Sequence, residues 1–348
     1  MNFVKRFIFG FRVFFKDISV RDIFRVFCFM VKRFLLRTPV PVSVVFALTY
    51  KCQCNCVHCS VGDYNKFGNT LSTKEIKETI DFIARWGPIK ITFFGGEPLL
   101  RKDILDIVKY ASGKGLRVSV DTNGICLDKA MVVSLKRARV SNINVSIDSV
   151  NAEIHDTLRR SPGCFGKAIE GLELCVKHNI PCLISTYASK GAIKRKDLEG
   201  IVRLGKRIGV SGVKILFPIL SGKWRKAEEE RLDPEEEDYI KSLIDPSFVY
   251  LEDALEMLKS SGKGCSALRR NLIYISPYGD IQPCPAIPIS FGNIRSENIR
   301  KIVVRMTRHD FFRKYASCKG CLMNAKGFRV KYFLKANEAG LPLYVDKF

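Results

Sequence analysis

A short segment near the start of the chain holds several cysteines at a spacing that suits metal binding. Cys52, Cys56 and Cys59 follow an apolar run at 42–48 and are spaced C-x3-C-x2-C. Three thiolates on one loop can bind three irons of a [4Fe–4S] cluster and leave the fourth iron open for a cofactor. Cys54 interrupts the pattern and allows a four-thiolate zinc site as the alternative. Otherwise we expect Cys54 to be a spectator that faces the outside of the loop.

This spacing resembles the signature of the radical S-adenosylmethionine (SAM) superfamily, which usually has an aromatic ring just before the third cysteine. His58 occupies that position here. A second match follows the next apolar run, where the chain reads Gly95, Gly96, Glu97 and Pro98. This segment resembles the GGEP motif of the family, whose backbone and carboxylate hold the methionine ammonium group of SAM. Glycine allows close backbone approach, and a glutamate can accept charge-assisted hydrogen bonds.

Three shorter segments resemble further elements of the family. Residues 121–124 (DTNG) resemble its strand-end TNG, residues 146–149 (SIDS) its S-[IL]-D element, and residues 155–159 its HD-x-x-R stretch. The resemblance implies that Asn123, Ser146 and Asp148 bind near the ribose and carboxylate of SAM. The alternative for all three segments is ordinary strand-end capping and helix initiation.

A second group of cysteines lies near the end of the chain: Cys265, Cys284, Cys318 and Cys321. With Gly279, the first two give C-x13-G-x4-C, which resembles the start of the SPASM and Twitch extensions of radical SAM enzymes. A full SPASM domain has seven cysteines and two auxiliary clusters, so the four cysteines here imply one fully ligated [4Fe–4S] cluster that transfers electrons. A four-cysteine zinc site is the alternative.

Apolar, β-branched runs at 42–48, 89–94, 116–121, 142–148, 181–187 and 213–219 alternate with helical patterns. Such alternation predicts parallel strands joined by right-handed crossovers. About six units fit into residues 42–220, too few for a closed eight-unit barrel, so we expect an α/β fold with a partial (β/α)6 barrel. The cysteine loop and the GGEP, DTNG and SIDS segments all follow strands. Because reacting groups gather at the carboxyl ends of parallel strands, these segments should share one site.

The expected domain boundaries follow from these patterns. They are a basic amphipathic helical extension at 1–40, the partial barrel at 42–220, a linker and helix at 221–260, and a small iron–sulfur domain at 261–348. The extension interleaves basic residues with apolar ones and has no apolar run long enough to cross a bilayer. It predicts either attachment to an anionic membrane surface through Phe7, Phe11, Phe14 and Phe15, or a helix packed on the barrel with its basic face in water.

The chain has 348 residues, 13 cysteines and a formal net charge of +23. Clustered cysteine spacings suit metal binding in a reducing compartment, so we expect a cytoplasmic protein, with the inner membrane face as a more specific location. Cys28, Cys126, Cys164, Cys175 and Cys182 are expected as small buried hydrophobic residues or free thiols. Nucleic acid ranks lowest among partners for the basic charge, because no nucleic-acid-binding motif is present.

The family resemblance implies reductive cleavage of SAM to a 5′-deoxyadenosyl radical that abstracts hydrogen from a substrate. We expect a peptide or protein side chain first, and a lipid, small molecule or cofactor precursor second. A reducing partner such as flavodoxin or ferredoxin is implied. Asp148 and Asp280 are candidate bases, whereas Pro285 replaces an aspartate of sulfatase-maturating relatives and argues against that activity. A non-catalytic iron–sulfur electron carrier is the alternative from another class.

Overall fold

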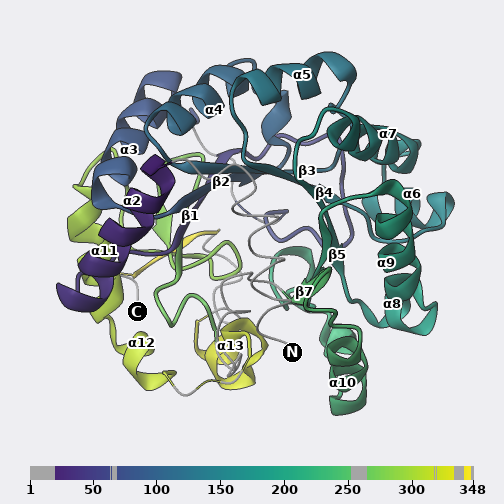
Figure 1. Ribbon diagram of the computed structural model, residues 1–348. Coiled ribbons are helices and arrows are strands. Elements are labelled where there is room, and N and C mark those ends of the chain that lie inside the picture. The colour runs from purple at the N-terminus through teal and green to yellow at the C-terminus, as the bar shows by residue number, and fades with distance from the viewer. Residues whose placement is uncertain are drawn as a thin grey trace.

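The computed structural model describes residues 20–62, 64, 69–251, 265–316, 318, 320–332 and 341–345. Within them, six strands alternate with helices in the order expected from the sequence (Figure 1). The elements of this part are β1 (Ser43–Thr49), α3 (Thr73–Trp86), β2 (Lys90–Gly95), η2 (Pro98–Leu100), α4 (Ile104–Gly113), β3 (Arg117–Thr122), α5 (Lys129–Arg137), β4 (Asn142–Ser146), α6 (Ala152–Arg159), α7 (Cys164–Lys177), β5 (Cys182–Tyr187), α8 (Lys190–Lys194), α9 (Asp197–Ile208) and β6 (Gly212–Leu216).

The sheet of the described residues has the order β7-β6-β5-β4-β3-β2-β1-β8-β9, and β1 to β6 run parallel to one another. The predicted α/β fold with a parallel, open barrel is therefore confirmed. The sheet extends beyond the range expected for the barrel. β7 (Val249–Leu251) pairs with β6 at one edge, and β8 (Leu272–Ile275) pairs in parallel with β1 at the other.

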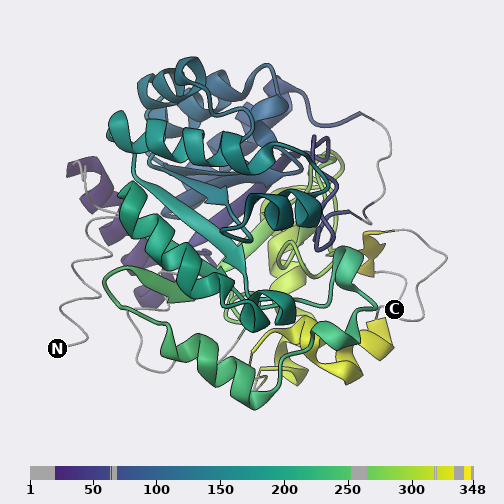
Figure 2. The same cartoon turned by 90° about the vertical axis from the view of Figure 1, so that its right-hand side faces the viewer.

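The C-terminal part begins with a hairpin, in which β8 pairs antiparallel with β9 (Ile281–Gln282). It continues with β10 (Ile289–Ser290), α11 (Ile299–Arg308), α12 (Asp310–Lys314), η6 (Leu322–Asn324), α13 (Lys326–Tyr332) and β11 (Leu343–Tyr344). Figure 2 shows the yellow helical segments of this part at the lower right of the molecule, away from the blue helices that cover the barrel. Because β8 joins β1, the hairpin is anchored directly on the barrel sheet.

The segment after β6 contains η3 (Gly222–Trp224), η4 (Glu228–Glu230) and α10 (Pro234–Ser242), so the expected linker also carries short helical turns. Local caps explain where several helices begin. Ser72 Oγ accepts a hydrogen bond from the Glu75 backbone N–H, and the Glu75 carboxylate accepts one from the Ser72 backbone N–H, which forms a capping box at the start of α3. The same helix ends at Gly87, whose φ of +112° suits glycine.

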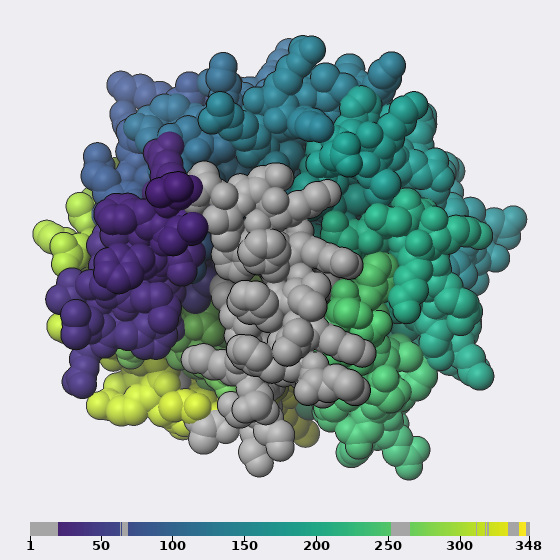
Figure 3. All heavy atoms as spheres, in the orientation of Figure 1, coloured from purple at the N-terminus to yellow at the C-terminus, as the bar shows by residue number. Residues whose placement is uncertain are grey.

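The N-terminal extension is described from α2 (Val20–Met30) through a π-helical turn, η1 (Val31–Leu35). Phe7, Phe11, Phe14 and Phe15, which were expected on its apolar face, lie outside the described residues. The purple atoms of α2 form part of the molecular surface in Figure 3. The expectation of a basic face in water is wrong here, because Arg25 and Arg33 point at the barrel and donate hydrogen bonds to its backbone carbonyls. None of the described helices has the length and apolar character needed to span a bilayer.

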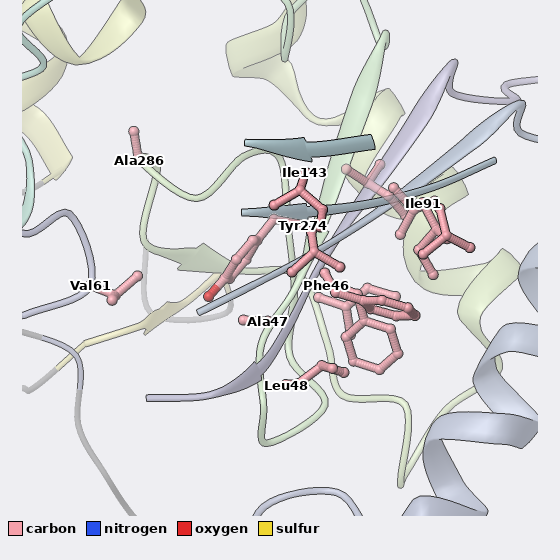
Figure 4. Close-up of a cluster of buried hydrophobic side chains, with 14 of the residues drawn as sticks. Phe46, Ala47, Leu48, Val61, Ile91, Ile143, Tyr274 and Ala286 are labelled. Atoms are coloured by element: carbon pink, nitrogen blue, oxygen red, sulfur yellow. The ribbon is translucent and has the colours of Figure 1, made fainter. Parts of the chain in front are cut away.

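The hydrophobic core lies around the sheet and reaches into the C-terminal part. Figure 4 shows Phe46 of β1, Ile91 of β2, Ile143 of β4 and Tyr274 of β8 in one cluster of buried side chains. All four side chains are buried. The Tyr274 hydroxyl lies 2.7 Å from the Tyr50 hydroxyl, so a buried hydrogen bond links β8 to the start of the cysteine loop. The core therefore fixes the loop from the side of the C-terminal part as well as from the barrel.

Candidate active site

The four predicted segments meet at the carboxyl ends of β1 to β4. The Gly96 backbone N–H donates to the Thr49 carbonyl at 2.7 Å, and the Glu97 N–H donates to the Lys51 carbonyl at 2.8 Å. Asn123 Nδ2 lies 3.6 Å from Cys52 Sγ and 3.1 Å from Gln53 Oε1. The GGEP segment and the end of β3 therefore contact the cysteine loop directly, as expected from their positions after parallel strands.

Gly95 and Gly96 are required by this close approach. A Cβ atom on Gly95 would lie 2.1 Å from the Thr49 carbonyl oxygen, and one on Gly96 would lie 2.4 Å from the Lys51 carbonyl oxygen. Gly95 also has a φ of +141°, which side-chain-bearing residues rarely adopt. The two glycines thus let the backbone after β2 pack against the backbone that carries the first cysteine. Pro98 follows as the first residue of η2 and is buried.

Glu97 is fully buried, and its carboxylate links the ends of β2 and β3. Oε1 accepts hydrogen bonds from Thr122 Oγ1 at 2.9 Å and from the Leu99 N–H at 3.1 Å, while Oε2 accepts one from the Asn123 N–H at 2.8 Å. Burial raises the pKa of Glu97 to about 7, although these three donors oppose the rise. Both oxygens thus already have partners within the chain.

The thiols of the cysteine loop are all outside disulfides, and Cys52 is the most exposed of them. The expectation that Cys54 faces the outside of the loop is wrong. Its Sγ lies 4.0 Å from Sγ of Cys164, a buried residue at the start of α7. Hydrogen bonding with Cys54 lowers the pKa of Cys52 to about 6 and that of Cys164 to about 5, while the pKa of Cys54 is raised.

The end of α6 holds the cysteine loop in place. The Asn55 N–H donates to the Arg159 carbonyl at 3.0 Å, and the Val57 N–H donates to the Leu158 carbonyl at 2.9 Å. The Arg159 side chain is buried, lies 2.8 Å from Asp148 Oδ2 and reaches Cys56 Sγ at 4.0 Å. Arg159 therefore connects the residue after β4 with the second cysteine.

Two histidines lie next to the buried Asp148, one at its carboxyl group and one at its backbone N–H. His58 Nε2 lies 3.5 Å from Asp148 Oδ2, and His155 Nδ1 accepts a hydrogen bond from the Asp148 N–H at 3.1 Å. Burial lowers the pKa of His58 to about 4, so this ring is neutral at pH 7. Burial opposes ionisation of Asp148, but Arg159 and the two histidines hold its pKa below the usual value. Asp148 thus acts as the ionised partner of Arg159, which does not suit the role of a base.

Sequence reasoning gave little weight to Arg159 and His155 and none to Cys164 or Trp224. The HD-x-x-R spacing was the available signal for the first two, because it places His155 and Arg159 one helical turn apart on α6. Trp224, in the segment expected as a linker, packs with its ring centre 5.5 Å from that of His58. No local pattern could indicate this contact, since η3 follows the loop by more than 150 residues in sequence.

The second candidate base, Asp280, stabilises the turn between β8 and β9. It is buried in the β8–β9 turn, where its carboxylate accepts hydrogen bonds from Ser276 Oγ, Ser290 Oγ and Asn293 Nδ2. Because these donors come from the turn, from β10 and from the segment after β10, Asp280 organises the hairpin rather than a reacting group. Ser146 ends β4 and is half-buried.

The four C-terminal cysteines are half-buried and lie in different elements: Cys265 before β8, Cys284 after β9, Cys318 after α12 and Cys321 before η6. Burial is the main reason that the pKa of Cys318 is raised, and the nearby Cys265 adds to the rise. These two thiols therefore lie close enough to interact electrostatically. Among the described side chains, no group of three or more His, Cys, Asp or Glu is already arranged to hold a metal ion.

The chemistry of the cysteine loop fits a [4Fe–4S] cluster. Its thiols are free, its first cysteine is exposed, and Arg159 supplies a positive charge beside Cys56 that favours thiolate. The neighbouring backbone after β2 leaves room only for glycine, so the loop and GGEP segment are fixed together. These properties suit thiolate ligands for iron, and the sulfur-rich C-terminal group suits the same metal.

Comparison with known proteins agrees with this interpretation. Residues 46–204 match the radical SAM superfamily, and residues 265–322 match the SPASM iron–sulfur cluster-binding domain. An AdoMet-dependent heme synthase of Methanosarcina barkeri is 31% identical over 76% of this chain and 82% of its own length. The subtilosin biosynthesis protein AlbA of Bacillus subtilis is 26% identical over 76% of this chain, which spans only 60% of AlbA. Streptococcus suis SuiB bound to its precursor peptide SuiA has a TM-score of 0.64 at 13% identity, covering 78% of this chain and 67% of SuiB.

The chain belongs to the radical SAM superfamily and carries a SPASM domain. It is an enzyme of this class. Its cofactors are SAM, a [4Fe–4S] cluster that the radical SAM domain binds, and auxiliary iron–sulfur clusters in the SPASM domain. The similarity to SuiB supports the fold alone, because the sequence identity is low.

Proposed function

We propose that this enzyme abstracts a hydrogen atom from a peptide or protein side chain, with Cys52, Cys56 and Cys59 as ligands of the catalytic cluster. Cys265, Cys284, Cys318 and Cys321 hold the auxiliary [4Fe–4S] cluster in this proposal. When bound, the catalytic cluster supplies the electron that cleaves SAM to methionine and a 5′-deoxyadenosyl radical. We place the enzyme in the cytoplasm, at the inner face of the membrane, with flavodoxin or ferredoxin as reductant.

The observation that carries the substrate class is the polar interior of the barrel. Val145 lies beside α7, and Ile184 and Val213 lie beside α9, so these side chains face the outer helices. Because side chains alternate along a strand, their neighbours face the interior. The interior therefore includes Asn144, Ser146, Ser185 and Lys214.

The same interior carries a hydrogen-bonded row across β3 and β4. Asn142 Nδ2 donates to Asn144 Oδ1 at 3.0 Å, and Asn144 Nδ2 donates to Ser119 Oγ at 3.3 Å and to Asp121. Such amide and hydroxyl groups suit a substrate that is itself rich in hydrogen-bonding groups, as a peptide backbone is. They disfavour a lipid chain, because burying polar groups against hydrocarbon is costly.

The chain's own residues bind and orient the SAM molecule in this proposal. The backbone of Gly95, Gly96, Glu97 and Pro98 and the side chains of Asn123 and Ser146 contact SAM in this proposal. The buried Glu97 carboxylate supports this surface by accepting a hydrogen bond from the Asn123 N–H. Asp148 and Arg159 position the cysteine loop through the contacts of Arg159 with Asp148 and Cys56. The neutral ring of His58 packs against Tyr187 and Trp224 and helps exclude water from the loop.

A carboxylate-bearing small molecule is the second candidate. The relative that is 31% identical is named a heme synthase, and a protein of the same organism that is 33% identical over 58% of this chain is named an Fe-coproporphyrin III synthase. A porphyrin with several carboxylates would suit Lys214 in the barrel interior and the net charge of +23.

The two substrate classes are distinguished by following hydrogen into 5′-deoxyadenosine. The reconstituted, reduced enzyme is incubated with SAM and with separate peptide, small-molecule and lipid fractions from cells grown in heavy water, and with iron coproporphyrin alone. Deuterium in 5′-deoxyadenosine from the peptide fraction supports the proposal. Deuterium only from the small-molecule fraction, or turnover with the porphyrin alone, favours the second candidate, and deuterium only from the lipid fraction contradicts both.

Two cysteine variants serve as a matched pair in this assay. Cys56→Ser removes a proposed ligand and is expected to abolish 5′-deoxyadenosine formation. Cys54→Ser makes the same sulfur-to-oxygen replacement at a nearby cysteine that is not a proposed ligand. This variant is expected to keep iron binding and SAM cleavage. Equal loss in both variants would contradict the assignment of Cys52, Cys56 and Cys59 as the ligand set.

A further inference from the structure

The described part of the N-terminal extension presents its apolar side to solvent. Exposed fractions are large for Ile23 (58%), Phe24 (65%), Phe27 (62%), Phe34 (57%), Leu35 (75%) and Leu36 (61%). Scattered exposed apolar residues are common, but a continuous row of this kind marks an interaction surface. We call this row the apolar ridge.

The ridge is held outward because the basic side of α2 is bonded to the barrel. Arg25 Nη1 donates to the Pro88 carbonyl at 3.0 Å, and its Nη2 donates to the Lys114 carbonyl at 2.8 Å. Lys32 Nζ donates to the carbonyls of Arg85 and Trp86 at 3.0 and 3.1 Å. Arg25 and Lys32 thus provide hydrogen-bond donors to backbone carbonyls at the end of α3 and just before β2 and β3. These bonds fix the rotation of α2 about its own axis.

Arg33 fixes the following turn in the same way. Its guanidinium donates to the carbonyls of Val40, Arg270 and Arg269 at 2.7, 2.9 and 3.0 Å. Burial and the nearby positive charge of Arg270 lower the pKa of Arg33. These bonds tie η1 to the segment before β8, so the exposed side chains of Phe34 and Leu35 sit on a rigid base.

A basic groove of about 760 Å³ adjoins the ridge, between η1 and the helices α11 and α12. Its lining includes Arg33, Arg37, Arg269, Arg270, Arg308 and Arg313. No acidic side chain is among the described residues that line it, and Asp310 outside the lining pairs with Arg313. Like charges gathered in this way create a site that favours a multivalent anion such as phosphate.

We propose that the apolar ridge and the basic groove together dock this enzyme onto an anionic phospholipid bilayer. The ridge enters the boundary between headgroups and acyl chains, and the groove binds lipid phosphates. Leu36 of the ridge and Arg37 of the groove are neighbours in sequence, and Figure 3 shows the purple helix beside the yellow-green and yellow atoms of the C-terminal helices. A surface that combines both features matches a membrane with negative headgroups.

Other occupants fit these observations less well. A second copy of the chain would bring another +23 charge and another arginine groove to the interface, which repels at close range. A nucleic acid would neutralise the groove but would leave the six apolar side chains in water. Only the bilayer satisfies the apolar and the basic surface at once.

This docking would orient the active site away from the bilayer. The carbonyl groups that bind α2 belong to residues before β2 and β3, whereas the cysteine loop and GGEP segment follow the other ends of β1 and β2. Figure 2 shows the purple helix on the left of the molecule and the dark loop after β1 on the right. The substrate would then enter from water, so this inference does not depend on which substrate class is correct.

The test is flotation of the full-length, cluster-loaded enzyme with vesicles of phosphatidylcholine, with and without phosphatidylglycerol. We expect flotation only with the anionic vesicles and its loss at high salt. The double variant Phe24→Gln, Phe27→Gln is expected to weaken binding at least about tenfold, because two large apolar side chains are lost from the ridge. Val150→Gln with Val330→Gln is the matched control, since both valines are exposed elsewhere on the surface.

A second set of variants tests the groove against a control that has the same change in net charge. Arg37→Glu with Arg308→Glu should reduce binding to anionic vesicles at least about tenfold. Arg203→Glu with Arg207→Glu changes the net charge equally on exposed positions of α9 and should have little effect. Equal loss in both pairs, or no flotation of the wild-type enzyme, would overturn the proposal. So would a dimer that the Phe24 and Phe27 changes convert to a monomer, or tighter binding to RNA than to the vesicles.

Discussion

At the scale of single residues, the buried ion pair of Arg159 and Asp148 joins the end of α6 to the residues after β4. Both side chains are almost completely buried, and Arg159 also reaches Cys56. A buried pair contributes little to stability as a whole, yet removing one partner leaves the other as an uncompensated charge. The pair therefore fixes the position of the cysteine loop relative to the end of β4.

Replacing Arg159 tests this role. Arg159→Met is expected to lower the free energy of unfolding by roughly 3–5 kcal/mol and to reduce the iron bound on reconstitution. Arg159→Lys keeps the charge and should recover part of both losses. Urea unfolding of the apoprotein and iron analysis measure the two effects, and Arg160→Met is the exposed control. Iron binding that is unchanged in a folded Arg159→Met variant would exclude Arg159 as a positioning residue.

Glu97 gives a prediction about pH. The pKa of Glu97 is raised from its usual 4.5 to about 7 in the folded chain. Between pH 4.5 and pH 7 the folded state therefore binds more protons than the unfolded state. Stability is then lost as the pH rises through this window, by roughly 3 kcal/mol at most. The apoprotein of Glu97→Gln should lack this fall, whatever its absolute stability. Thermal unfolding from pH 4.5 to 7.5 compares the slopes, and identical slopes would contradict the buried, proton-binding Glu97.

At the scale of elements, the close packing of the ends of β1 and β2 brings the cysteine loop and the GGEP segment together. Gly95→Ala would place a methyl group 2.1 Å from the Thr49 carbonyl oxygen at a φ of +141°. We expect this change to lower the free energy of unfolding by about 2–5 kcal/mol and to impair SAM cleavage.

Gly113→Ala at the end of α4 is the control for this prediction, because its Cβ would meet no atom within 4 Å. It should leave SAM cleavage intact and leave stability unchanged or raised by up to about 1 kcal/mol. Chemical unfolding and 5′-deoxyadenosine formation are measured for both variants. Similar behaviour of the two would mean that the backbone after β2 can move away from the loop.

At the scale of the whole molecule, the C-terminal part is joined to the barrel through β8 and through the Tyr50–Tyr274 hydrogen bond. The proposed auxiliary cluster would therefore be held by a segment that shares a sheet with the catalytic loop. Such continuity suits electron transfer between two centres in one rigid body.

Metal analysis tests the two-cluster proposal. The reconstituted wild-type enzyme should contain about eight irons with matching sulfide, and the variant with Ala at positions 52, 56 and 59 about four. The variant should still show the visible absorption of an iron–sulfur cluster but form no 5′-deoxyadenosine. Zinc without sulfide in that variant would contradict the assignment of Cys265, Cys284, Cys318 and Cys321 to a [4Fe–4S] cluster.

The sequence by itself determined the order of strands and helices, the parallel sheet and the segments that meet at its carboxyl ends. Local information was enough because alternating apolar runs, the capping box at Ser72 and the GGEP glycines each depend on residues close together in sequence. The tertiary structure decided the remaining features. Amphipathicity could not tell which side of α2 faces the barrel, because that depends on carbonyl groups at the ends of distant strands that Arg25 and Arg33 bind. The contacts of Arg159 with Cys56 and of Trp224 with His58 arise in the same way, since only folding brings these residues together.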